Sequence, residues 1–486
     1  MRKRFELQLS IGQTPIEEIR INPKSKNALD QLIAALKEIY CNKEYNDRIF
    51  SIIEKYLPKV DKNNGRPGMN LWTIFVLGQV RMCLGLDYDM LHNLSNNHSL
   101  LRKLLGISEM FGEEPVIFEY QNIYDNVTML SETMLKEINE VIVEFGHREV
   151  FKKKETTALR LKTDSFVVES NVHFPTDYNL LWDCARKCLD TVTIFLEEYP
   201  EIEGWRKIKN WRSELKGLMR QVGRSSRGGG KNKQEKLQKA TLPYLEKNRL
   251  LFIKLVAAKR NFPLITQSDL AVHYTLENYM QLLLKHIDLL DRRIIKGETI
   301  PQSEKMMSIF ESYTEWIVKG KSHPSVELGK MLTITSDQYD LILYHKTMNE
   351  EQDRDIVVET ADWLLNKYKR IESMSFDKGH WSKENKELLE LEIPQVILPK
   401  LGKLTVEEKE IEDSRLFKRL KNKHSAIESN INELEHRGLD RCPDRSYPHF
   451  TTYIALGVCA YNLKKIGKRI LENQKQYQEV LTKKAA

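Results

Sequence analysis

The stretch Leu161-Lys162-Thr163-Asp164-Ser165-Phe166-Val167-Val168 decides the fold, because it interrupts long helical segments with residues that favour strands. Its leucine, phenylalanine and valine residues predict a strand, and Asp164 ends the first apolar run. A second run, Ser373-Met374-Ser375-Phe376, also predicts a strand and is followed at once by Asp377. Because two strands each deliver a carboxylate, Asp164 and Asp377 become candidates for one shared site.

Further short strands and helices surround these two runs. Apolar or alternating stretches bounded by turn residues predict strands at 316–318, 331–334, 341–344 and 396–398. Helical spacing of apolar residues predicts helices at 361–368, 383–391 and 417–434. Strands followed by alternating helices and strands are typical of an α/β fold with a sheet of mixed direction.

The remaining regions are predicted to be helical and define the domains. Residues 1–150 form an N-terminal domain whose short helices suit either a helix-turn-helix-like DNA-binding unit or a packed bundle without DNA contact. The sheet-forming core is split into 155–178 and 306–470 by a helical insertion at 179–305, and 471–486 form a helical tail. A glycine-rich basic stretch near 222–236 predicts a flexible linker or a DNA-contacting loop, since its glycine spacing does not fit a P-loop.

Composition sets limits on the class of protein. The chain has 486 residues and a net charge of +7, which is compatible with nucleic-acid binding but does not require it. No apolar run approaches the roughly 18–20 residues of a membrane span, and the N-terminus lacks a signal-peptide pattern. Six scattered cysteines do not form a disulfide framework. We therefore expect a cytoplasmic protein without a membrane partner.

A third carboxylate lies in Lys423-His424-Ser425-Ala426-Ile427-Glu428-Ser429, where Glu428 borders the apolar stripe of the predicted helix 417–434. Three carboxylates from three separate elements are what a two-Mg²⁺ phosphoryl-transfer site needs, because Mg²⁺ takes oxygen ligands. We therefore predict that Asp164, Asp377 and Glu428 are catalytic and bind Mg²⁺, with Mn²⁺ as a substitute. Taken singly, the aspartates could be turn residues and Glu428 a solvated helix residue.

Four blocks of the chain resemble DDE transposases of bacterial insertion sequences, close to the ISNCY-like group. Three of them carry the carboxylates: Thr163-Asp164-Ser165 with 172–183, Phe376-Asp377-Lys378-Gly379-His380, and 424–428 with 438–442. The fourth is 311–329, which resembles the strand pair between the aspartates, and Gly65-Arg66-Pro67-Gly68 resembles the start of the N-terminal domain. The resemblance implies an RNase H-like catalytic core, Mg²⁺-dependent cleavage at terminal inverted repeats and strand transfer into target DNA.

Several basic residues and two tryptophans are candidates for DNA contacts. Phosphate contacts are expected from residues that flank the inferred site in sequence, although each could belong to a solvated basic face: Arg66, Lys319, Lys321, His424, Arg437 and Arg441. Trp182 and Trp316 could stack on unpaired bases, or pack in the core. The resemblance implies double-stranded DNA as the partner, a homodimer that joins two ends, and association with the bacterial nucleoid.

Two other functions stay open at the level of sequence. A catalytically inactive, transposase-derived DNA-binding or assembly protein would keep the fold without cleaving DNA. A helical scaffold would account for the helix-rich region, but it gives no reason for aspartates at the ends of two strands.

Overall fold

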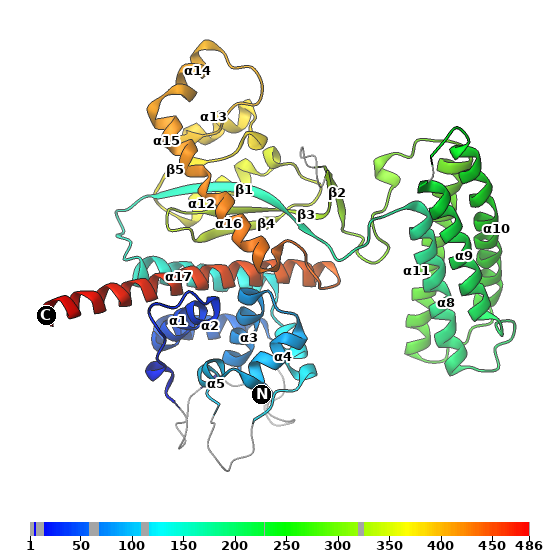
Figure 1. Cartoon of the computed structure of the whole chain (residues 1–486), viewed down its shortest axis with the longest axis horizontal. Coiled ribbons are helices and arrows are strands. Elements are labelled where there is room, and N and C mark those ends of the chain that lie inside the picture. The colour runs from blue at the N-terminus through cyan, green and yellow to red at the C-terminus, as the bar shows by residue number, and fades with distance from the viewer. Residues whose placement is uncertain are drawn as a thin grey trace. The chain divides into compact units, whose positions relative to one another are not determined.

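The computed structural model describes residues 4–5, 14–57, 68–107, 116–227, 229–318 and 325–485. The chain divides into two compact units (Figure 1). Met1–Asn171 and Ile317–Ala486 form the first, which we call the sheet unit, and Val172–Trp316 form the second, the helical unit. In the described part of the chain, no helix is both long and apolar enough to cross a membrane.

Six strands of the described residues form one mixed sheet in the order β2-β3-β1-β5-β6, with β4 paired to β3. Their bounds are β1 Leu159–Glu169, β2 Glu315–Val318, β3 Val326–Ser336, β4 Ile342–Thr347, β5 Ile371–Ser375 and β6 Gln395–Ile397. Strand β3 runs antiparallel to β1 and β4, whereas β5 runs parallel to β1 and β6. The mixed α/β class predicted from the sequence is confirmed.

The central strand β1 is buried along most of its length, as expected for a strand with neighbours on both sides. Its parallel pairing with β5 matches Leu161 with Met374 and Lys162 with Ser375. Two positions beyond that last pair lie Asp164, which is still inside β1, and Asp377, which comes two residues after β5 ends at Ser375. The register of one parallel ladder therefore brings both aspartates to the same level of the sheet.

The sheet unit also contains many helices, and the predictions at 361–368 and 383–391 correspond to α12 and α13. Their bounds are α1 Ala28–Cys41, α2 Lys43–Tyr56, α3 Leu71–Leu84, α4 Tyr88–Asn97, α5 Ser99–Leu104, α6 Tyr120–Val127, α7 Glu132–Phe145, α12 Val357–Lys367, α13 Lys383–Glu392, α14 Val406–Asp413, α15 Arg415–His424, α16 Ala426–Leu434 and α17 Tyr447–Ala485. The predicted helix 417–434 is in fact two helices, which meet at Ser425.

Helix α17 lies between the sheet and the N-terminal helices (Figure 1), and it packs against α1, α3, α7 and β4. A Cβ atom at Gly467 would lie only 1.6 Å from the Gln31 carbonyl oxygen, so α17 and α1 touch backbone to backbone. The buried Asn462 accepts a hydrogen bond from the Ile342 backbone N–H at 2.8 Å and thereby ties α17 to β4. Residues 1–150 consequently belong to the same compact unit as the sheet, and the helical tail predicted from residue 471 is a continuation of α17, which runs to Ala485.

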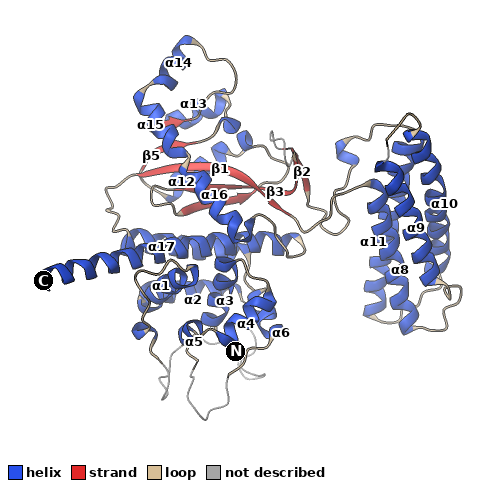
Figure 2. Cartoon of the chain, viewed as in Figure 1, coloured by secondary structure: helices blue, strands red, loops and turns tan. Residues whose placement is uncertain are grey.

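The helical unit is a bundle in which α8 Asp177–Glu198, α9 Ile208–Arg227, α10 Lys233–Lys259 and α11 Gln267–Leu290 surround one apolar core (Figure 2). Trp182 belongs to this core, in agreement with its packing alternative. The linker predicted near 222–236 is wrong in its extent, because α9 continues to Arg227 and α10 begins at Lys233. Gly223 serves close packing instead, since a Cβ there would lie 3.1 Å from the Tyr178 ring.

Candidate active site

Asp164 and Asp377 occupy equivalent levels of adjacent parallel strands, as the β1–β5 register requires. The Asp164 side chain is half-buried, and its Oδ1 accepts a hydrogen bond from the Ser165 N–H at 2.8 Å. Asp377 follows β5 directly and caps the short 3₁₀ turn Lys378–His380. The sequence prediction that Asp164 ends a strand is wrong, because β1 continues through it to Glu169; Asp377 does follow β5, as predicted.

The turn after β5 holds the Asp377 carboxylate with two donors. Asp377 Oδ1 accepts a hydrogen bond from the Gly379 N–H at 3.0 Å and contacts Nδ1 of the fully buried His380. Gly379 passes between two carboxylates, because a Cβ there would lie 3.1 Å from Asp353 Oδ2 and 3.3 Å from Asp377 Oδ1. A side chain at position 379 would therefore push the carboxylates apart.

Asp353 joins this cluster, although the sequence analysis did not select it. One ligand atom from each of Asp353, Asp377 and His380 lies within 4.8 Å of the others, and Ser165 Oγ donates a hydrogen bond to Asp353 Oδ1. The Asn385 side-chain amide fixes the loop by donating to the Arg354 carbonyl at 2.7 Å and the His380 carbonyl at 3.1 Å. No local signal singles Asp353 out, since it lies in an acidic loop that by sequence resembles any solvated turn.

The environments of Asp164 and Asp377 push their pKa values apart. The pKa of Asp164 is raised to about 6, chiefly by burial and also by the charges of Asp377 and Asp353, which together outweigh the Ser165 N–H and His380. Burial alone would raise the pKa of Asp377 too, but the hydrogen bond and charge of His380 hold it below its usual value. Near neutral pH, Asp377 is therefore ionised, whereas Asp164, with a pKa of about 6, takes up a proton only slightly below neutral pH.

His424 reaches the same cluster from the end of α15. Its Nδ1 lies 3.0 Å from Ser375 Oγ, which also donates to the Leu161 carbonyl at 3.2 Å. Ser375 uses its single hydroxyl proton in the hydrogen bond to the Leu161 carbonyl, so its oxygen accepts the hydrogen bond from His424. Nδ1 of His424 therefore carries the ring proton, and Nε2 keeps a lone pair. Nε2 is buried without a hydrogen-bond partner among the described residues, and burial lowers the pKa of His424 to about 4. The result is a neutral imidazole nitrogen able to accept a proton or bind a metal.

Glu428 lies on α16 with an exposed side chain that bonds to no side chain in the described ranges. Its helix crosses the sheet near the cluster, because His424 contacts Ser375 and Asn430 donates to Ser336 Oγ at 3.1 Å. Ser375 and Ser336 both pair with Lys162, which is two residues, or about 7 Å, before Asp164. Residues two apart in a strand share a face, so Asp164 and α16 lie on the same side of β1.

The other basic candidates lie away from the carboxylates or outside the described residues. Arg441 forms a bridge with Glu169, five residues or about 17 Å along β1 from Asp164. Arg437 lies beside Gly85 at the end of α3, since its backbone would be 3.4 Å from a Cβ atom added to that glycine. Arg66, Lys319 and Lys321 fall in stretches that the structure does not describe. Among the residues predicted to contact phosphate, His424 is the one that a described hydrogen bond links to β5, the strand just before Asp377.

The donor set fits a hard divalent cation. Asp164, Asp377 and Asp353 supply carboxylate oxygens, and the buried Nε2 of His424 is an orphaned lone pair beside them. Oxygen-rich sites with an occasional imidazole suit Mg²⁺ and Mn²⁺. The charges of Asp377 and Asp353 raise the pKa of Asp164, so these carboxylates repel one another and a bound cation would relieve that repulsion.

Comparisons with protein-family models, curated protein sequences and solved structures found no match to this chain.

Proposed function

We propose that this protein is a DDE-type transposase, a metal-dependent nuclease and polynucleotidyl transferase acting at the ends of an insertion sequence. One observation carries the proposal: the β1–β5 register brings Asp164 and Asp377, two residues chosen by motif alone, to one level of adjacent strands. They are more than 200 positions apart in the sequence, and an unrelated pair of turn aspartates has no reason to meet.

Asp164 and Asp377 would hold Mg²⁺, with Glu428 completing the ligand set from α16. When bound, Mg²⁺ supplies an activated attacking oxygen and stabilises the charge that develops on the leaving oxygen. His380 orients the Asp377 carboxylate, and the Ser165 hydroxyl orients Asp353. Asp164 must lose its proton before it can act as a ligand, which its raised pKa makes more demanding at acid pH.

The placement of α16 supports Glu428 as the third carboxylate. Its helix crosses β1 on the face that carries Asp164, and glutamate has the length to reach across a short gap from an exposed position. Asp353 is the competing candidate, because it already lies beside Asp377. Substituting each separately distinguishes the two.

The remaining parts of the proposal follow from the resemblance. The mixed sheet centred on β1 is compatible with an RNase H-like core, and the helices of 1–150 would recognise the terminal inverted repeats. A homodimer would hold two ends together, and double-stranded DNA would contact basic residues such as Arg441. The alternative is a catalytically inactive, transposase-derived protein that binds DNA without cutting it.

The test is cleavage of a labelled duplex that carries the DNA flanking the gene, measured with Mg²⁺, with Mn²⁺ and with EDTA. We expect metal-dependent nicks with 3′-hydroxyl ends, lost in Asp164→Asn, Asp377→Asn and Glu428→Gln while duplex binding stays unchanged. Asp362→Asn, at an exposed position of α12, is the matched control. Wild-type rates in Asp164→Asn or Asp377→Asn would contradict the proposal, and binding without cleavage by the wild type would favour the inactive alternative.

A further inference from the structure

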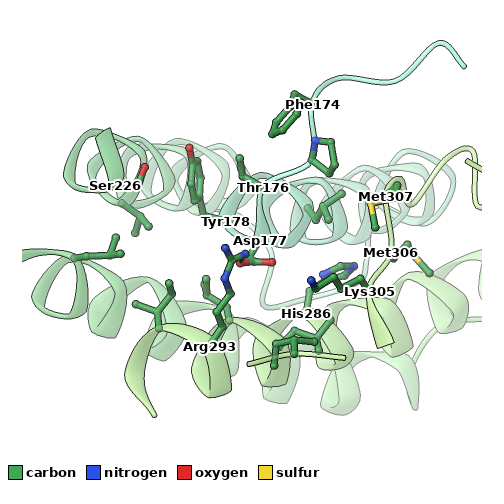
Figure 3. Close-up of a pocket in the computed structure, with 18 of the residues that line it drawn as sticks. Phe174, Thr176, Asp177, Tyr178, Ser226, His286, Arg293, Lys305, Met306 and Met307 are labelled. Atoms are coloured by element: carbon green, nitrogen blue, oxygen red, sulfur yellow. Dashed lines mark hydrogen bonds and ion pairs between the residues drawn. The ribbon is translucent and has the colours of Figure 1, made fainter. Parts of the chain in front are cut away.

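The helical unit contains a cavity of about 580 Å³ that the proposed cleavage site does not use. It lies where the chain enters α8 and where α11 ends, and Figure 3 shows side chains from both converging on it. Its volume falls within the roughly 300–1,000 Å³ of pockets that bind small molecules. All of its lining residues fall within Val172–Trp316, and the last of them, Trp316, lies in β2.

The walls of the cavity are apolar, and its mouth is aromatic. Leucine, isoleucine and methionine side chains form the walls: Leu180, Leu237, Leu289, Leu290, Ile294 and Met306. Phe174 is 60% exposed at the mouth, and its ring packs edge-on against Trp316 with the centroids 5.4 Å apart. An exposed phenylalanine beside a half-buried tryptophan offers flat apolar surface on which another ring can stack.

The charges around the cavity are predominantly positive. Arg293 is neutralised by an ion pair with Asp177, toward which it extends in Figure 3. Lys233 and Lys305 also line the cavity, are exposed, and make no ion pair with any described residue. Two unpaired ammonium groups beside an apolar hollow favour a ligand that is itself apolar and carries a negative charge.

One buried polar group points to a ligand with hydrogen-bonding edges. His286 lines the cavity, is 1% exposed, and its Nε2 has no hydrogen-bond partner in the described part of the chain. A buried polar atom without a partner costs free energy that a ligand's donor or acceptor would recover. Burial lowers the pKa of His286 to about 4, so the imidazole is neutral near pH 7 and can donate or accept.

We infer that this cavity binds an unpaired nucleotide, with the base between the aromatic mouth and His286 and the phosphate at Lys233 and Lys305. A base combines a flat ring, polar edges and an attached anion, and each of these meets its counterpart on the lining. A simple anion would leave the apolar walls unused, and an uncharged apolar ligand would leave the lysines unused. The inference rests on the proposed function only in taking the nucleotide from a DNA strand.

The experiment measures binding of the full-length protein in EDTA, so that cleavage plays no part. The probes are a blunt duplex, the same duplex with a two-nucleotide 2-aminopurine overhang, and free 2-aminopurine nucleoside monophosphate. We expect the overhang to bind at least ten-fold more tightly than the blunt end, with quenched fluorescence as the base stacks. Asp164→Asn should bind in the same way, so failure of the proposed cleavage and failure of this inference are distinguishable.

Two variants remove the parts of the site separately without touching the core of the bundle. Phe174→Ala should weaken overhang binding about 5- to 100-fold, as expected for a lost stacking platform, whereas Tyr274→Ala, an exposed aromatic outside the lining, should not. The double variant Lys233→Gln with Lys305→Gln should lower the slope of log binding constant against log salt concentration by about 1.4, because each contact to a single-strand phosphate contributes about 0.7. Lys236→Gln with Lys239→Gln is the charge control, since neither lysine lines the cavity.

Each outcome decides the inference. Overhang binding that is equal in Phe174→Ala, the lysine variant and their controls would overturn it. If the free nucleotide binds as tightly as the overhang and both variants lose it, the nucleotide site stands and its DNA source is overturned. Quenching lost in Phe174→Ala but kept in Tyr274→Ala, for the overhang alone, supports the inference in full.

Discussion

The two units each bury a histidine whose Nε2 lacks a partner among the described residues, yet they surround it with opposite charges. In the sheet unit, His424 contacts Ser375 of β5 and feels the charge of Asp377, whereas in the helical unit His286 faces an apolar cavity edged by lysines. Burial lowers the pKa of both imidazoles to about 4, so both are neutral near pH 7. The difference is the reason why we propose a cation for the first site and an anion for the second.

The contrast has a structural origin. A parallel ladder fixes the level of residues on neighbouring strands, so short acidic side chains converge without any packing between them. Helices pack through large side chains, and where two helices end the space between them is left lined with leucine, isoleucine and methionine. Substitutions in one unit should therefore leave the function of the other intact, and the predictions below test that separation.

The largest effect is expected at Asp164 and Asp377. Asp164→Asn and Asp377→Asn should each reduce DNA cleavage by more than about 100-fold, above the range for residues that merely support a metal ligand. Overhang binding by the helical unit should change by less than two-fold in the same proteins. Parallel loss of both activities, measured on one preparation, would mean that the substitutions unfold the chain or that the sites are not separate.

A smaller loss is expected at Asp353. Because it touches Ser165 and lies beside Asp377, Asp353→Asn should cost about 10- to 100-fold in cleavage or in apparent Mg²⁺ affinity. Ser165→Ala removes only the hydrogen bond to Asp353 and serves as the companion variant. Equal effects of the two would identify Asp353 as a positioning residue, and a much larger effect of Asp353→Asn would identify it as a ligand in place of Glu428.

Alanine substitutions at one glycine in each unit compare how tightly the two units are packed. Gly467→Ala in the sheet unit should destabilise the protein by about 1–3 kcal/mol or more, because a Cβ would overlap the Gln31 carbonyl. Gly217→Ala in α9 should stabilise the helical unit by about 0.5–1 kcal/mol, since nothing lies within 4 Å of the new methyl group. Urea unfolding, combined with hydrogen exchange measured peptide by peptide, assigns each change in stability to its unit. An unchanged free energy of unfolding in Gly467→Ala would refute the close approach of α1 and α17.

Acid should weaken the helical unit through His286. Its folded pKa of about 4 lies below the usual 6.5, with Lys285 adding to the effect of burial, so the unfolded chain binds the proton more readily. Stability should be retained above pH 6.5 and fall by about 2 kcal/mol between pH 7 and pH 5. His286→Leu should flatten this dependence in denaturant unfolding of the full chain, and an unchanged slope would show that other groups cause it.

Part of this site was predictable from the sequence because its signals are local. Asp164 and Asp377 each stand next to a short apolar run, so their candidacy needed no knowledge of distant contacts, although β1 in fact continues past Asp164. Asp353 could not be found in this way, since only the folding of a loop onto the turn after β5 brings it to Asp377. Glu428 remains a prediction: the helix that carries it crosses β1 on the same face as Asp164, but its side chain is exposed.

The fold, like the site, was predictable where its signals are local and not where they depend on residues far apart in the sequence. Strand and helix positions followed from periodicity, and the mixed α/β class with them. The packing of α17 against α1 depends on Gly467 and Gln31, residues more than 400 positions apart, and no periodic pattern in either helix predicts it. The glycine-rich stretch was misassigned because Gly223 permits helix packing against Tyr178 rather than a turn.

The most direct test of the central claim, that β1 and β5 bring Asp164 and Asp377 to one divalent cation, is iron-directed cleavage of the protein backbone in solution. Fe²⁺ takes oxygen and imidazole ligands and, with ascorbate and peroxide, cuts the chain near the place where it is bound. We predict cuts within a few residues of both Asp164 and Asp377, suppressed by excess Mg²⁺ and lost when both aspartates are changed to asparagine. Cuts confined to other regions, or the same cuts in the double variant, would contradict the account.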